Sequence, residues 1–141
     1  LDVSVTGVDT KKQLVELCGD IARSSDFERL NFVHGYINDF DFKDTDVLIA
    51  LHACNTATDD AIFKGIEANA DLIVVAPCCH QEIRPQIKAP ALLKDVLKHG
   101  VMLEREAETL TDGLRAMLLE RSGYGAKIFE FIGTEHTPKN N

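Results

Sequence analysis

Two kinds of segment alternate along the chain: apolar runs of strand length, and stretches in which apolar residues recur at helical spacing. The apolar runs lie within 3–8, 30–34, 46–51, 72–77 and 127–132. The runs at 46–51 and 72–77 show no alternation of apolar and polar side chains, which is typical of strands buried on both faces of a parallel sheet. Five strands are therefore predicted, and the two continuous runs favour parallel pairing.

Four other segments predict helices, because their apolar residues recur every three or four positions. The first begins at Thr10, where Gln13 three residues later completes a capping box. The others are expected over 58–68, from Pro90 to a stop at Gly100, and over about 108–121. The resulting order, β-α-β-β-α-β-α-α-β, predicts an open α/β fold of the Rossmann-like kind, with a mostly parallel sheet and helices on both faces. No repeat or linker divides the chain, so a single domain over 1–141 is expected.

The net charge and the positions of the cysteines make some classes of protein less expected than others. Lys and Arg number 15 against 23 Asp and Glu, a net charge of −8, so a self-contained nucleic-acid binder with a basic face is not expected. No apolar run reaches the length of a membrane helix. Cys78 and Cys79 are adjacent, which suits a reducing compartment better than a disulfide framework, and a cytoplasmic protein is expected.

Polar and chemically active residues follow the predicted strands. In an open parallel sheet, ligands bind outside the carboxyl ends of the strands. Most of the histidines and cysteines lie at or beside such ends. The candidate segments are Asp9, 35–38, 52–55, 78–81 and 133–136.

These residues allow more than one interpretation. Asp9 suits a ribose diol, because a carboxylate accepts two hydrogen bonds, but its position alone favours a helix N-cap or an exposed loop acid. The residue types match a zinc site at His52, Cys54, Cys78, Cys79 and His80, although the spacing is poor and no metal is expected. A Cys79 nucleophile with a histidine base lacks a supporting oxyanion-hole motif, and small packing groups remain the plainest interpretation of the cysteines.

Two motifs in order resemble one branch of the class I S-adenosylmethionine-dependent methyltransferases. Leu51 to Asp59 reads LHACNTATD, and Ala76 to His80 reads APCCH. The branch includes tRNA 2′-O-methyltransferases that act on the acceptor stem and related methyltransferase-like proteins. The segments 110–115 and 135–140 agree with the same pattern.

The resemblance implies roles for the residues at the strand ends. Asp9 binds the ribose hydroxyls of S-adenosylmethionine, and Gly35, Tyr36, Ile37 and Asn38 line its adenine. His52, Ala53 and Cys54 lie beneath its methionine end, while Cys79 and His80 face the substrate. His80, ahead of His52, is expected to act as base if the acceptor is a hydroxyl. The chain departs from the pattern at Tyr36, where many relatives have Asp, and at Asn55, where Gly is commoner.

The implied function is methyl transfer, with RNA as the first expected acceptor and a small molecule or protein as the others. A non-catalytic domain that serves protein interaction, and a metal or redox site at the Cys/His segments, are the alternatives. The family's first strand and its glycine-rich loop have no counterpart here, so we expect a part of a longer protein with weak cofactor binding of its own. Either the family's second and fourth strands pair directly, or another chain, such as a second copy, covers their exposed edges.

Overall fold

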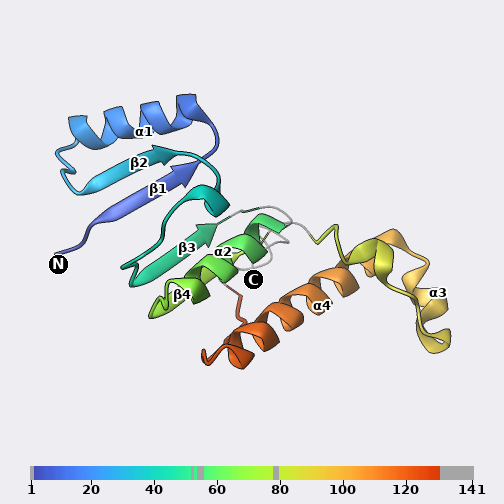
Figure 1. Cartoon of the computed structure of the whole chain (residues 1–141). Coiled ribbons are helices and arrows are strands. Elements are labelled where there is room, and N and C mark those ends of the chain that lie inside the picture. Colours follow the sequence, from blue (N-terminus) through green and yellow to red (C-terminus); the bar gives the residue numbers. More distant parts are fainter. Residues whose placement is uncertain (1, 52, 54–55, 78–79, 131–141) are drawn as a thin grey trace. The chain divides into compact units, whose positions relative to one another are not determined.

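The computed structural model describes residues 2–51, 53, 56–77 and 80–130. The chain divides into two compact units, Leu1–Lys43 and Asp44–Asn141 (Figure 1). The expectation of one domain over 1–141 stays a prediction.

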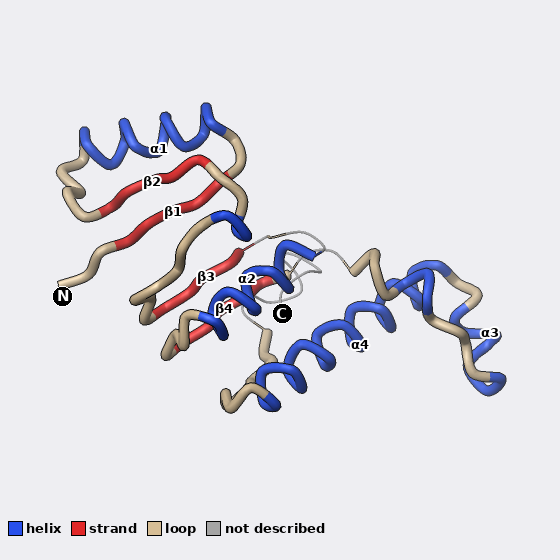
Figure 2. Tube along the Cα trace, in the orientation of Figure 1, coloured by secondary structure: helices blue, strands red, loops and turns tan. Residues whose placement is uncertain are grey.

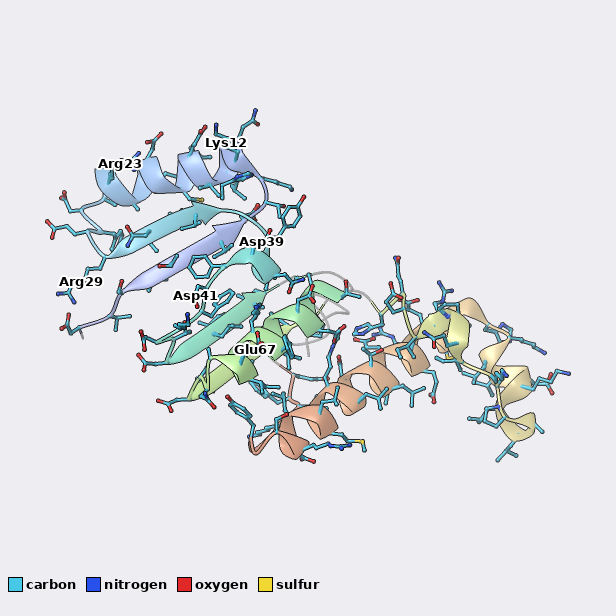
Figure 3. The ribbon with its side chains drawn as sticks, in the orientation of Figure 1. Lys12, Arg23, Arg29, Asp39, Asp41 and Glu67 are labelled. Atoms are coloured by element: carbon cyan, nitrogen blue, oxygen red, sulfur yellow. The ribbon has the colours of Figure 1, made fainter. Side chains whose placement is uncertain are left out.

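The first unit is a parallel strand pair covered by one helix. Its elements are β1 (Val5–Asp9), α1 (Lys12–Ser24), β2 (Leu30–His34) and a 3-10 turn, η1 (Ile37–Asp39). The strands pair in register from Val5↔Leu30 to Asp9↔His34. Helix α1 packs on the pair through the buried Ala22, and Figure 3 shows Lys12 and Arg23 on its far side from the strands.

Helix α1 begins later than the sequence predicts, and the hydrogen bond that precedes it differs from the predicted one. It starts at Lys12 with Lys11 as the N-cap residue, whose side chain makes no capping bond, so the capping box at Thr10 and Gln13 is wrong. The Asp9 carboxylate accepts a hydrogen bond from the Lys11 backbone N–H. An acid at the end of the strand thus fixes the turn before the helix.

The second unit also begins with a parallel strand pair and its crossover helix. These elements are β3 (Val47–Leu51), α2 (Thr56–Glu67) and β4 (Leu72–Ala76), paired from Val47↔Leu72 to Leu51↔Ala76 (Figure 2). Buried Leu48, Ala61 and Ile62 form the core between α2 and the strands, whereas Ile49 and Leu51 on β3 are exposed. Over the described residues the other face of this pair is exposed, so the predicted burial of these two strands on both faces is not observed there.

The helices after β4 differ most from the prediction. They are two 3-10 turns, η2 (Arg84–Gln86) and η3 (Ala91–Leu93), one turn of α3 (Lys94–Leu97) and the long α4 (Gly100–Arg121). A glycine ends a helix when it adopts a positive φ. In the described part of the chain Gly123, just after α4, is the glycine with positive φ, whereas Gly100 begins α4. The predicted stop at Gly100 and helix start near 108 are therefore wrong.

The fifth predicted strand, 127–132, is also wrong as far as the structure describes it. Residues 127–130 are irregular, and Ile128 and Phe129 are exposed. A strand needs a hydrogen-bonded neighbour, and no neighbouring strand pairs with this segment over its described residues.

The strand pairing confirms the fold class. Parallel strands joined by crossover helices form a mixed α/β structure consistent with an incomplete Rossmann-like fold. Each described pair, β1–β2 and β3–β4, lies within one unit. How the expected second and fourth strands, β1 and β3, are completed stays a prediction.

Candidate active site

The carboxyl ends of β1 and β2 bring Asp9 and His34 to one edge of the first unit, since the two residues are partners in the parallel register. The Gly35 backbone N–H donates to the Asp9 carbonyl over 3.1 Å. The His34 ring donates through Nε2 to the Thr10 carbonyl over 3.0 Å. These bonds hold the segments that follow each strand against each other.

The Asp9 carboxylate has a structural partner in the described chain. Its Oδ1 accepts the Lys11 backbone N–H at 2.7 Å, in the turn between β1 and α1. Because the N-cap of α1 is Lys11, this bond makes Asp9 an acid of the turn before the helix and not its N-cap, and it orients the carboxylate. The predicted contact with ribose stays a prediction, and both roles are chemically compatible because a carboxylate has several acceptor positions.

The turn after β2 leaves an aromatic side chain exposed. Tyr36 is 68% exposed, and its carbonyl accepts the Asp39 N–H as η1 begins at Ile37. A Cβ added at Gly35 would meet no atom within 4 Å, so the backbone there borders open space. A carboxylate acceptor, an open backbone and an exposed aromatic ring suit an adenosine group, and the predicted adenine contacts of 35–38 stay predictions.

The end of β3 in the second unit is fixed by a threonine of the next helix. The buried Thr58 hydroxyl, in the first turn of α2, donates to the Ala53 carbonyl. His52 and Cys54 lie outside the described residues, as do Cys78 and Cys79. Their predicted roles beneath a methionine group or facing a substrate are therefore untested.

His80 lies after β4 and is 4% exposed. Its carbonyl accepts the Arg84 N–H, which begins the turn toward η2. Its ring nitrogen Nδ1 lies 4.0 Å from Oδ1 of Asp112 on α4. A histidine beside a carboxylate is the usual pairing for an acid–base residue, because the carboxylate orients the ring and stabilises its protonated form.

Asp112 belongs to a set of charged side chains that joins α4 to α2. Arg115, one turn after Asp112, places Nη1 3.5 Å from the same Oδ1. Its Nε and Nη2 donate to the two oxygens of Asp59 at 2.7 and 3.3 Å. We call Asp59, His80, Asp112 and Arg115 the charge cluster, of which all but Asp59 are buried.

Burial dominates the ionisation of Asp112. Desolvation raises the pKa of this carboxyl above its usual 3.8, and nearby Glu108 raises it further. His80 and Arg115 oppose the rise by favouring the charged carboxylate, so the pKa stays raised against two cationic or potentially cationic neighbours.

The sequence analysis did not assign Asp59, Asp112 or Arg115 a role. Asp112 and Arg115 lie in the segment 110–115 that agrees with the methyltransferase pattern, and their spacing of three residues places them on one helix face. That spacing was the available signal, but their burial against His80 and Asp59 depends on tertiary packing. Within the described ranges no three His, Cys, Asp or Glu residues form a group that could hold a metal, and no helix is long and apolar enough to cross a membrane.

Comparison with known proteins gives one match. No curated protein and no solved structure matches the chain. A family model described as a methyltransferase domain matches residues 1–86, which include β1 to β4, Asp9 and His80. The match covers more than half of the chain and the strand ends described above. The chain therefore belongs to this methyltransferase domain family.

Proposed function

We propose that the protein transfers a methyl group from S-adenosylmethionine to a hydroxyl acceptor, with His80 as the general base. The observation that carries this choice of acceptor is the approach of Asp112 to the buried His80 ring. A hydroxyl must lose its proton as it is methylated, and an imidazole ionises in the right pH range to take it.

Asp9 and the turn 35–38 are proposed to hold the cofactor. The Asp9 carboxylate accepts hydrogen bonds from the ribose hydroxyls, and the backbone and ring of Tyr36 border the adenine. Bound S-adenosylmethionine supplies a methyl group on a sulfonium, and the electrons of the broken S–C bond stay on sulfur as the new C–O bond forms. The acceptor proton passes to Nε2 of His80.

RNA is the proposed acceptor, through a ribose 2′-hydroxyl. The support is the resemblance of 51–59 and 76–80 to methyltransferases that act on tRNA. The net charge of −8 leaves this chain little attraction for phosphates, so binding should depend on salt less steeply than in a basic RNA-binding protein.

The test is methyl transfer from radiolabelled S-adenosylmethionine to total RNA, to protein and to a small-molecule extract. Label should enter RNA, and nuclease P1 digestion should recover it as a 2′-O-methylnucleotide. His80→Gln should lower the rate roughly 100-fold or more, the usual worth of a general base. His99→Gln is the matched control, because His99 is an exposed residue just before α4. Full activity of His80→Gln, with its melting temperature unchanged, would remove His80 as the base.

A further inference from the structure

We infer that Asp112 is the positioning residue of His80, and that Arg115 and Asp59 hold Asp112 in the orientation this requires. The inference rests on the proposed role of His80 and assigns roles to residues for which the resemblance implies none. The matched segment of the chain ends at residue 86, so Asp112 and Arg115 lie outside it.

The contacts form a continuous path from the N-terminal part of α2 to the ring. Asp59 binds Arg115 through two parallel hydrogen bonds, a geometry that fixes the guanidinium plane. Arg115 then approaches Oδ1 of Asp112 at 3.5 Å. The same oxygen is the one that lies 4.0 Å from Nδ1 of His80.

Burial makes this path effective on the ring. His80, Asp112 and Arg115 are 4%, 9% and 6% exposed, so water screens their mutual attraction weakly. Asp112 faces Nδ1, which favours the tautomer with its proton on Nδ1 and leaves Nε2 as the basic nitrogen. When Nε2 takes a proton, the positive ring faces the carboxylate. The 4.0 Å separation is longer than a hydrogen bond and is expected to shorten in that state.

Arg115 also explains how Asp112 can serve as a carboxylate while it is buried. An unpaired buried carboxylate would tend to take up a proton, and a neutral acid would no longer attract the protonated ring. The guanidinium cannot lose its charge, so it favours the ionised form at all relevant pH values. Asp59 occupies the opposite side of the guanidinium and keeps it from turning to solvent.

Nitrogen-15 NMR of the whole chain with labelled histidine tests the inference without an activity assay. In the wild-type protein the neutral His80 ring should carry its proton on Nδ1, and Asp112→Asn should abolish this preference. Glu104→Gln is the matched control, because Glu104 is also on α4 but pairs with Arg84. It should leave the His80 spectrum unchanged. The inference is overturned if the wild-type ring carries its proton on Nε2, a measurement that needs no variant. It is also overturned if the His80 ring of Asp112→Asn gives the same spectrum as wild type.

Kinetics separate this inference from the proposed function. Asp112→Asn should lower kcat about 10- to 100-fold while the Kd for S-adenosylmethionine stays within twofold, because the carboxylate acts on the ring. A changed His80 tautomer together with full activity of His80→Gln would support the positioning contact and overturn the base. A His80 tautomer that Asp112→Asn leaves unchanged, together with loss of activity in His80→Gln, would support His80 as the base and overturn the positioning contact.

Discussion

Arg115 on α4 and Asp59 on α2 are 56 positions apart in the sequence and are joined by two hydrogen bonds, of 2.7 and 3.3 Å. The two partners differ in environment: the side chain of Arg115 is 7% exposed and that of Asp59 is 52% exposed. Replacing Arg115 should therefore destabilise the protein more than replacing Asp59. Arg115 also neutralises the buried Asp112, whereas Asp59 can be replaced by water.

Arg115→Met should destabilise the protein by about 3 kcal/mol near neutral pH, because it leaves the Asp112 carboxylate buried without its cation. Asp59→Asn should cost less than about 1 kcal/mol, because Arg115 keeps its contact with Asp112 and the Asp59 side chain is half exposed. Urea unfolding of the two variants measures the difference. Arg121→Met, which removes an exposed arginine from the last turn of α4, controls for a general loss of positive charge on this helix. Equal costs for Arg115→Met and Arg121→Met would contradict the prediction.

Asp112 should make stability fall as pH rises above the ordinary range of a carboxyl group. Burial raises the pKa of Asp112 in the folded protein above 3.8, so the folded state holds this proton more tightly than the unfolded state does. Its favourable contribution is complete below about pH 3.8 and is lost as pH rises through the raised pKa. The groups that act on Asp112 are His80, Arg115 and Glu108.

The measurement is the free energy of unfolding of wild type minus that of Asp112→Asn, followed from about pH 3 to pH 7. This difference should decrease with rising pH. An increase would mean that ion pairing with Arg115 outweighs burial and that the pKa of Asp112 is lowered.

The elements that the sequence predicted well are those whose signal is local. Strand β2 has the predicted bounds, and β3 and β4 agree within one residue. A continuous apolar run, as in β3 and β4, identifies a strand without knowledge of its partner. The start of α4 could not be predicted in this way. Whether Gly100 ends a helix or begins one depends on its φ, which the packing of the neighbouring segments decides.

The residues of the candidate site could likewise be predicted only where their signal is local. Asp9, Gly35 and His80 could be proposed because they lie at or shortly after the ends of strands, and the carboxyl ends of parallel strands are where ligands bind. Asp112 and Arg115 lie in the middle of a helix, where charged residues are ordinarily exposed. Only the approach of α4 to α2 and to the segment after β4 makes them buried partners of Asp59 and His80.

Gly65 should resist substitution because α2 lies close to β4 at this position. A Cβ added there would lie 2.7 Å from Cδ1 and 2.8 Å from Cγ1 of Ile73. Gly65→Ala should therefore cost about 1–3 kcal/mol, the usual range for overpacking a core. In an Ile73→Ala background the same change should cost clearly less, since both clashing atoms are gone.

Gly113→Ala on α4, where a Cβ would meet nothing within 4 Å, should instead stabilise by up to about 1 kcal/mol. Thermal unfolding of the four variants measures these effects, and additive costs of Gly65→Ala and Ile73→Ala would contradict the clash.

Asp9 offers a substitution that separates its structural bond from its proposed contact with the cofactor. Asp9→Asn keeps an oxygen that can accept the Lys11 N–H, now seen at 2.7 Å, but removes the negative charge. We expect its melting temperature to stay near that of wild type, while S-adenosylmethionine binds about tenfold more weakly, because hydrogen bonds to a charged acceptor are the stronger ones. Asp9→Ala should lose both the bond to Lys11 and the affinity for the cofactor. Calorimetric titration of the two variants beside thermal unfolding provides the comparison. If Asp9→Asn binds as wild type does and Asp9→Ala loses affinity only in proportion to its stability, then Asp9 serves the turn before α1 and not the ribose.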